Sequence, residues 1–263
     1  MAAPKSNAFV LTATDYGPML VNRFDYCGGP GNIWGVGHEL LNTSSYEADV
    51  IKILTELLNV RREFDGDGVV VMDCGANVGT FTLSLARHIL GWGELLAIEA
   101  QERVFYALAG NIAINNLFNA RALWTAVGEA SGSIEIPRIN YLEPASFGSL
   151  ELMESMTNED IGQTLNRSPG RGQVVAMTTI DELDLPRIDL IKIDVEGMEL
   201  QVLRGGLQSL RRSRPMMLLE HCKTSLTDLT RFLTQENYEA IVVGRNLVAI
   251  HKDDPVASRV KVG

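Results

Sequence analysis

The segment Val69–Gly79, VVVMDCGANVG, decides the fold of this 263-residue chain. Its first four residues are apolar and mostly β-branched, which is typical of a strand covered on both faces in a parallel sheet. Asp73 stands at the carboxyl end of that strand, and Gly75 and Gly79 permit a tight turn that approaches a ligand closely. From Thr80 onward apolar residues recur at helical spacing. The segment therefore predicts a strand, a glycine turn and a helix.

The turn also indicates what kind of ligand it meets. Free N–H groups at a helix N-terminus favour an anionic group such as a phosphate or a carboxylate. A dinucleotide fingerprint that starts at Gly75 requires glycine at positions 77 and 80, where this chain has Asn77 and Thr80. We therefore expect a nucleoside without a pyrophosphate, whose amino-acid end meets the turn, and S-adenosylmethionine fits that description. The residues expected to contact it here are Asp73, Gly75, Ala76, Asn77 and Gly79.

A second acidic strand end follows about twenty residues after the turn. The segment Glu94–Glu99, ELLAIE, predicts a short strand, and Glu99 is positioned to accept both ribose hydroxyls of a nucleoside. The alternative interpretation is a solvated acid at a strand end. The glycine turn at the right spacing before Glu99 favours the ribose-binding role over that alternative. We assign the neighbouring Ala100 to the same pocket, together with Ala126, whose backbone would meet the adenine edge.

Composition limits the classes of function. With 46% hydrophobic and 21% charged residues, the chain predicts a soluble globular domain with additions. A formal net charge of −10 argues against a nucleic-acid partner, because phosphate contacts require a basic surface. The three cysteines have neither paired nor metal-like spacing, and no stretch resembles a secretory signal or a membrane span. We therefore expect a cytoplasmic protein.

The chain divides into four parts by composition. Residues 1–45, rich in glycine and aromatic residues, predict an N-terminal cap over one edge of the pocket. Residues 46–253 predict the main domain, with helices near 45–60, 102–117, 198–210 and 224–235 and a closing hairpin over 238–252. The polar insertion at 140–173 is longer than most connections, so we expect a lid or a substrate-selecting segment, or simply a mobile one. Residues 254–263 predict a tail without a core contribution.

Charged residues interrupt the second informative segment, IDLIKIDVEGME at positions 188–199. Lys192 falls within a predicted central strand, where an ammonium must reach solvent or a partner acid because an unpaired buried charge is very costly. Asp194 and Glu196 follow at the carboxyl edge, where ligands bind in open α/β sheets. The next strand, which begins after Pro215, ends at that edge with Glu220 and His221. These five charged or titratable residues are the catalytic candidates.

These blocks together resemble one known family. The order and spacing of DCGANVG, AIE at 97–99, TAVGEASGSIEI, TTIDEL, IDLIKIDVEGMELQVLRGG and RPMMLLEH are similar to those of FkbM-family S-adenosylmethionine-dependent methyltransferases, from Tyr46 to His221. The resemblance implies an α/β, Rossmann-like class I fold with a mostly parallel seven-stranded sheet and an antiparallel edge hairpin. It also implies O-methylation of a hydroxyl group on a sugar, a polyketide or a related natural product. The cap and the insertion match nothing in the family pattern.

Methyl transfer to an alcohol needs a positioned base as well as alignment. The candidates are Asp194, Glu196, Glu220 and His221, of which histidine has the ordinary pKa best matched to neutral pH. Lys192 would hold a carboxylate charged, orient the substrate, or form a purely structural ion pair. Asp194, Glu196 and Glu220 would also furnish oxygen ligands for Mg²⁺, although their spacing is not diagnostic and we do not expect a metal.

Other functions remain open at the sequence level. Methylation of nitrogen would need no strong base, because a neutral amine is already nucleophilic. A nicotinamide-dependent oxidoreductase is disfavoured by Asn77 and Thr80, and a non-catalytic binding module is disfavoured by the lysine and acids at the carboxyl edge. The expected partner is a small-molecule hydroxyl acceptor, and the sequence leaves a homo-oligomer open.

Overall fold

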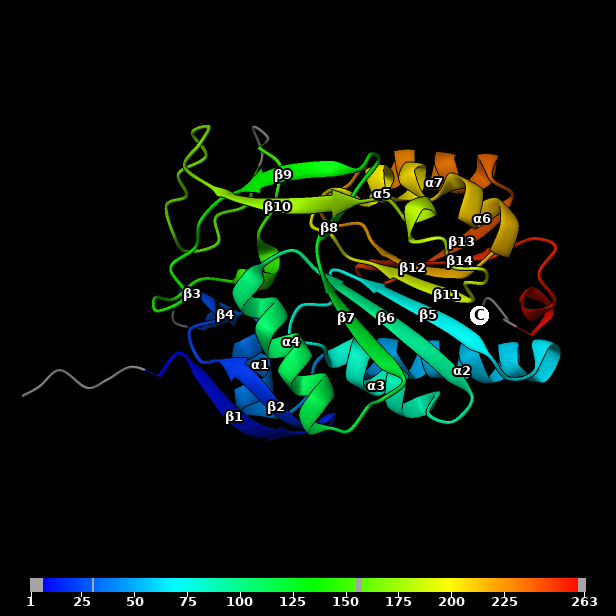
Figure 1. Cartoon of the computed structure of the whole chain (residues 1–263), viewed down its shortest axis with the longest axis horizontal. Helices are drawn as coiled ribbons and strands as arrows, with labels where there is room; N and C mark the ends of the chain where they lie inside the picture. Colours follow the sequence, from blue (N-terminus) through cyan, green and yellow to red (C-terminus); the bar gives the residue numbers. More distant parts are fainter. Residues whose placement is uncertain (1–6, 30, 155–157, 260–263) are drawn as a thin grey trace, which may run out of the picture.

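The centre of the computed structural model, which describes residues 7–29, 31–154 and 158–259, is a seven-stranded sheet. Its strands are β5 (Val69–Cys74), β6 (Gly93–Glu99), β7 (Ala120–Trp124), β11 (Leu190–Ile193), β12 (Met216–Glu220), β13 (Tyr238–Val243) and β14 (Asn246–His251). The strand order is β13-β14-β12-β11-β5-β6-β7 (Figure 1). β14 pairs antiparallel with both β12 and β13, and the other pairs are parallel. The predicted mostly parallel sheet with an antiparallel edge hairpin is confirmed.

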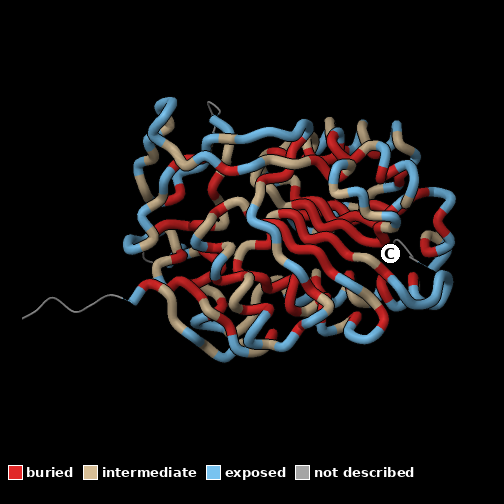
Figure 2. Tube along the Cα trace, viewed as in Figure 1, coloured by how far each residue is buried: buried red, intermediate tan, exposed pale blue. Residues whose placement is uncertain are grey.

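Helices cover both faces of this sheet. The helices α2 (Ala48–Asp65), α3 (Thr80–His88) and α4 (Glu102–Ile114) lie on one face, and α5 (Glu199–Gly205), α6 (Leu207–Ser213) and α7 (Leu226–Gln235) lie on the other (Figure 1). Successive strand residues point to opposite faces, so Val71 packs in the first core and Met72 in the second. Figure 2 shows the central strands as an almost continuous buried layer. The apolar run in β5 exists because both its faces are covered.

Smaller units flank the main sheet. The N-terminal part forms the hairpins β1 (Phe9–Thr14) with β2 (Gly17–Asn22) and β3 (Cys27–Gly29) with β4 (Asn32–Trp34), followed by α1 (Val36–Thr43). A separate three-stranded sheet joins β8 (Ala126–Val127), β9 (Gly132–Ile136) and β10 (Gln173–Thr178). Short 3-10 turns cover Phe147–Ser149 (η1), Asp181–Leu183 (η2) and Pro255–Ser258 (η3). Within the described ranges, no helix combines the length and apolarity that a membrane crossing requires.

Two sequence-based expectations are wrong. The helix predicted over 198–210 is split into α5 and α6 at Gly206, whose φ of −110° and ψ of 8° depart from helical geometry. The predicted tail also contributes to the core, since Val256 has no exposed surface and Asp254 forms a buried ion pair with Arg61. The last four residues of that tail, like residues 1–6 and 30 of the cap and 155–157 of the insertion, lie outside the described residues.

A charged pair crosses the centre of the sheet. Lys192 in β11 is the register partner of Asp73 in β5, and their side chains form an ion pair at 3.3 Å. Asp73 is fully buried and accepts a 2.6 Å hydrogen bond from the hydroxyl of Thr82 in α3. The ammonium of Lys192 also lies 5.1 Å from the ring centroid of Phe81. The lysine that interrupts the apolar strand is therefore compensated inside the protein.

One buried carboxylate joins the N-terminal part to the insertion. Asp25 accepts a 2.9 Å hydrogen bond from the amide of Gly37 in the first turn of α1 and another from the amide of Phe147 in η1. A carboxylate at a helix start satisfies amides that have no partner within the helix. Burial raises the pKa of Asp25 from 3.8 to about 6, although the two amide hydrogen bonds oppose that shift. Asp25 therefore links the start of α1 to η1, and its partner Phe147 lies 122 residues further along the chain.

Replacing Lys192 with Met should lower the free energy of unfolding by about 3–5 kcal/mol, because it leaves Asp73 as a buried carboxylate without its cation. Urea denaturation measures the change, and the exposed Lys252→Met serves as the matched loss of one charge, with an expected effect within about 0.5 kcal/mol. Adding Asp73→Asn to Lys192→Met should recover part of the loss. Equal stability of Lys192→Met and the control would refute the structural role of the pair.

Asp25 gives a stability that depends on pH with a defined sign. Because its folded pKa lies above its ordinary value, the folded protein binds the extra proton, and stability falls as pH rises from about 4 to about 6. An Asp25→Asn variant lacks this term, so the stability advantage of the wild type over the variant should shrink by about 3 kcal/mol between pH 4 and pH 7. Chemical denaturation of both proteins across that range measures it, and a constant difference would contradict it.

Candidate active site

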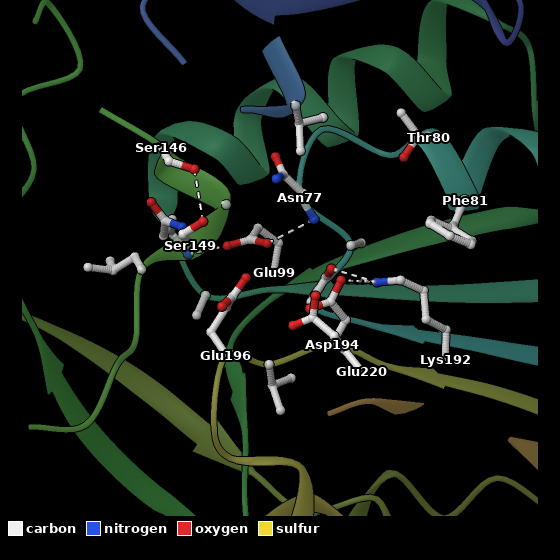
Figure 3. A pocket seen from close by; sticks show the side chains of 18 of the residues that line it. Asn77, Thr80, Phe81, Glu99, Ser146, Ser149, Lys192, Asp194, Glu196 and Glu220 are labelled. Carbon is white, nitrogen blue, oxygen red and sulfur yellow. Dashed lines mark hydrogen bonds and ion pairs between the residues drawn. The ribbon is translucent and has the colours of Figure 1, made fainter. Parts of the chain in front are cut away.

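An open cavity lies at the carboxyl edge of the main sheet, where β5, β6, β11 and β12 end. Its wall contains the glycine turn after β5, Glu99 at the end of β6 and three carboxylates that follow β11 and end β12. Figure 3 shows the labelled carboxylates Asp194, Glu196 and Glu220 grouped together below the Asn77–Glu99 pair. The two informative sequence segments therefore meet in one cavity.

The glycine turn is shaped by a close approach between two strand ends. Gly75 has a φ of 78°, and a Cβ at this position would lie 1.8 Å from the carbonyl oxygen of Asp194. Only glycine lets the turn after β5 pass so near the end of β11. Asn77 also adopts a positive φ of 50°, and its side-chain oxygen accepts a 2.7 Å hydrogen bond from the amide of Val78. Gly75, Ala76 and Asn77 all line the cavity, as expected for a ligand-binding turn.

Glu99 is held by backbone amides at the cavity wall. One carboxylate oxygen accepts a 3.0 Å hydrogen bond from the amide of Asn77, and the other accepts a 2.7 Å bond from the amide of Gln101. Burial raises the pKa of Glu99 to about 7, although both amide bonds oppose the shift. Each carboxylate oxygen has a second lone pair, so both can still accept a hydrogen bond from a ligand hydroxyl. This geometry fits a carboxylate that binds the two hydroxyls of a ribose.

The surface beside Glu99 continues through Ala100, Gln101, Thr125 and Ala126, all of which line the cavity. Gln101 was not predicted from the sequence. Its amide group donates a 2.8 Å hydrogen bond to the carbonyl of Phe147, and its oxygen accepts a 3.0 Å bond from the hydroxyl of Tyr141. These bonds attach the insertion to the end of β6. A single polar residue at a helix start carries no sequence signal for this contact.

The carboxylates of Asp194, Glu196 and Glu220 form a compact acidic group. Each offers an oxygen atom, and these atoms lie within 4.8 Å of one another. Burial and then the charge of Asp194 raise the pKa of Glu220 to about 8, against the opposing effect of Arg245. The same two causes raise the pKa of Glu196 well above its ordinary value, against the opposing effect of Lys223. Burial and the charge of Asp194 therefore favour a proton on Glu196 or Glu220.

Each of these carboxylates has its own cation. Lys192 lies 3.3 Å from Asp194 and also donates a 3.1 Å hydrogen bond to the carbonyl of Gly75. Burial alone would lower the pKa of Lys192, but Asp73 and Asp194 outweigh that effect and raise it. The other two cations were not predicted from the sequence.

Those cations come from two loops. Lys223 follows β12 and lies 2.6 Å from Glu196, and Arg245 at the tip of the β13–β14 hairpin lies 2.5 Å from Glu220. Arg245 also lines the cavity. The acids are therefore crowded but largely compensated by neighbouring charge.

Three of the predicted site residues do not line the cavity. The side chain of Asp73 is fully buried beneath it and pairs with Lys192, so its role is corrected to support of the site. Gly79 faces Leu108 and Leu83 in the core, where a Cβ would lie 2.8 Å and 3.0 Å from their methyl groups. His221 directly follows β12, and its amide donates a hydrogen bond to the carbonyl of Arg245. Because it is absent from the residues that line the cavity, its role as a base stays a prediction without support from the cavity wall.

The N-terminal part and the insertion at 140–173 both reach the cavity. Trp34, Val36 and Glu39 line it from the N-terminal part. Residues from the insertion do so as well, namely Ser146, Gly148, Ser149, Leu150, Leu152 and Glu159. A small core of Ala145, Phe147, Leu150 and Ile161 holds the described part of the insertion in place. These are the segments expected to select the acceptor.

Comparison with known proteins agrees with this geometry. Residues 73–240 match the family model described as the methyltransferase FkbM domain. Among curated proteins, the chain is 28% identical over 157 residues to Methyltransferase sdnD of Sordaria araneosa, which covers 51% of this chain and 59% of that protein. It is 27% identical over 150 residues to Methyltransferase 1 of Beauveria bassiana, with 53% of this chain and 59% of that protein covered. The match thus spans about three fifths of either relative's length.

A solved structure shares the fold. The crystal structure of the methyltransferase FkbM from Methylobacillus flagellatus superposes with a TM-score of 0.52 at 16% identity, over 70% of this chain and 44% of that chain. At this identity the likeness shows a common Rossmann-like class I architecture. The family match covers more than half of the chain and includes the glycine turn, Glu99 and the acidic group. The chain therefore belongs to the FkbM family of methyltransferases.

Proposed function

We propose that this protein transfers a methyl group from S-adenosylmethionine to a hydroxyl group of a small molecule, a sugar or another natural product. The observation that carries the proposal is that one cavity holds both halves of such a site. The glycine turn and Glu99 suit the cofactor, and the acidic group beside them suits removal of a proton from an alcohol. The cap and insertion segments that complete the wall would select the acceptor.

The residues present fit S-adenosylmethionine. Gly75, Ala76 and Asn77 would receive its amino-acid end, and Glu99 would accept its ribose hydroxyls. Ala100, Gln101 and Ala126 would border its adenine. When bound, this cofactor supplies an electrophilic methyl group on a sulfonium ion. The protein then has to hold the acceptor oxygen in line and take its proton.

Asp194 is our assignment for the base. It lines the cavity, its side chain is 31% exposed, and one of its buried carboxylate oxygens has no hydrogen-bond partner among the described residues. Lys192 lies 3.3 Å from the other oxygen and holds the carboxylate in place. Glu196 and Glu220, with raised pKa values, would accept or share the proton within the same group. An alcohol with several hydroxyl groups would find hydrogen-bond acceptors in these carboxylates.

A metal-dependent version of this chemistry is the less favoured alternative. The three carboxylate oxygens lie close enough together to hold one divalent cation. However, each carboxylate already has a neighbouring cation from the protein, namely Lys192, Lys223 or Arg245. These cations offset much of the repulsion between the carboxylates. We therefore propose that the protein cations do the work that Mg²⁺ does in metal-dependent methyl transfer, and that EDTA leaves activity unchanged.

Calorimetric titration of the purified protein tests the cofactor assignment. S-adenosylmethionine and S-adenosylhomocysteine should bind with micromolar dissociation constants, with and without Mg²⁺ or EDTA, and NAD⁺ should not bind. Glu99→Gln should weaken cofactor binding at least tenfold, because it loses one of the acceptor oxygens for the ribose hydroxyls. Binding of NAD⁺ alone would reject the methyltransferase assignment, and binding of none of the three would favour a non-catalytic module.

A transfer assay tests the base. With radiolabelled S-adenosylmethionine and a panel of hexoses and hydroxylated polyketides, Asp194→Asn should lower kcat about 10²–10⁴-fold on any acceptor that the wild type methylates. Affinity for S-adenosylhomocysteine should stay near that of the wild type. Asp184→Asn is the matched control, since Asp184 is exposed and has a positive φ of 47° that asparagine tolerates.

The same assay separates oxygen from nitrogen acceptors. If amines rather than alcohols are methylated, and Asp194→Asn remains within about twofold of the wild type, the acceptor needs no strong base. That outcome would replace the proposed O-methylation with N-methylation. It would leave the cofactor assignment intact, because the calorimetric result does not depend on the acceptor.

A further inference from the structure

Lys223 connects three separate parts of the cavity wall. It lies in the loop between β12 and α7, and its ammonium donates a 2.7 Å hydrogen bond to the carbonyl of Ser149 in η1. The same nitrogen lies 3.0 Å from a carboxylate oxygen of Glu159 and 2.6 Å from one of Glu196. Ser149 and Glu159 belong to the insertion, and Glu196 belongs to the acidic group. One side chain therefore ties the insertion to the site of proton transfer.

Three oxygen atoms surround the ammonium of Lys223 at 3.0 Å or less, one in a hydrogen bond and two in ion pairs. The side chain of Lys223 is only 12% exposed. Burial opposes its charge, but Glu196 and Glu159 raise its pKa and keep it protonated. A buried cation with three such partners restricts the positions that they can take.

The turn that carries Glu196 needs external support. Glu196 has a positive φ of 54° and Gly197 one of 97°, a backbone that favours glycine. Glu199 accepts hydrogen bonds from the amides of Val195 at 3.1 Å and Gly197 at 3.2 Å, and from the hydroxyl of Thr224. Thr224 is the residue next to Lys223. The loop after β12 therefore holds the backbone of this turn through Thr224 and its carboxylate through Lys223.

We propose that Lys223 is a positioning residue for the acceptor end of the cavity. It holds one stretch of the insertion, here called the acceptor wall, against Glu196. The acceptor wall consists of Ser149, Leu150, Leu152 and Glu159. This proposal rests on the proposed function for the meaning of that end of the cavity. Leu150 and Leu152 line the cavity beside Ser149, so a shift of the wall changes the space in which an acceptor lies. Without its cation, Glu196 would also face Asp194 and Glu220 with less compensation.

Hydrogen exchange measured by mass spectrometry tests the wall directly. In Lys223→Met, amides in a peptide covering residues 146–152 should exchange at least tenfold faster than in the wild type, because the anchor at Ser149 is lost. Lys223→Arg should restore at least half of the protection, since a guanidinium can bond the same three acceptors. The exposed Lys252→Met, which removes the same charge elsewhere, should leave the peptide unchanged.

A second readout separates positioning from simple loss of structure. Titration of ¹³C-labelled glutamate by NMR, with Glu196→Gln for assignment, should show a higher apparent pKa for Glu196 in Lys223→Met. The charged groups that face Glu196 are Asp194, Glu220 and Lys223, and only Lys223 differs between the two proteins. S-adenosylhomocysteine affinity should remain within about threefold of the wild type, because Lys223 contacts none of the residues assigned to the cofactor.

Two outcomes would overturn this proposal. Unchanged exchange in the 146–152 peptide would mean that Lys223 does not hold the wall, and a loss of cofactor affinity in parallel with faster exchange would mean that it serves the cofactor instead. Failure of the proposed function looks different. In that case the wild type itself would not bind S-adenosylhomocysteine. The exchange and titration measurements would still show whether Lys223 holds the acceptor wall, because they need no bound ligand.

Discussion

The structure depends on one buried cation, Lys192, which lies between Asp73 and Asp194 at 3.3 Å from each. Asp73 belongs to the strand that begins the cofactor turn, and Asp194 follows the strand that leads to the acidic group. An unpaired charge in this position would be very costly, so removal of Lys192 alone destabilises the contact between the two strands. The same constraint holds the turn, through the bond from Lys192 to the carbonyl of Gly75, against the acid assigned as the base. Fold stability and site geometry therefore rest on the same contact.

Charge compensation extends from this centre across the cavity. Carboxylates this close together would normally repel one another and take up protons. Here the cations that offset this effect come from three different elements, namely the strand β11 for Lys192, the loop after β12 for Lys223 and the tip of the edge hairpin for Arg245. Lys223 and Arg245 limit how far burial and neighbouring acids raise the pKa of Glu196 and of Glu220. The edge hairpin belongs to the site through Arg245, and the insertion belongs to it because Glu159 pairs with Lys223.

The N-terminal part and the insertion are joined by a different device. Asp25 lies in the N-terminal part, and its carboxylate accepts amide hydrogen bonds from the first turn of α1 and from η1. Gln101 attaches η1 to the end of β6 by a bond to the carbonyl of Phe147. This side of the cavity is thus joined to the main sheet by polar contacts between segments, whereas the glycine turn and Glu99 belong to the sheet edge itself.

Local patterns were enough to predict the parallel sheet, the glycine turn, the acid at Glu99 and the acids after Lys192, because each is a run of hydrophobic period, turn residues or strand-end charge. Three further facts came from the folded chain alone: His221 is absent from the cavity lining, Arg245 and Lys223 each pair with a carboxylate, and Asp25 joins two distant segments. These contacts could not be predicted from neighbouring residues. They form between parts of the chain that meet only when the sheet is assembled, and no period or spacing in the sequence indicates which residues will meet there.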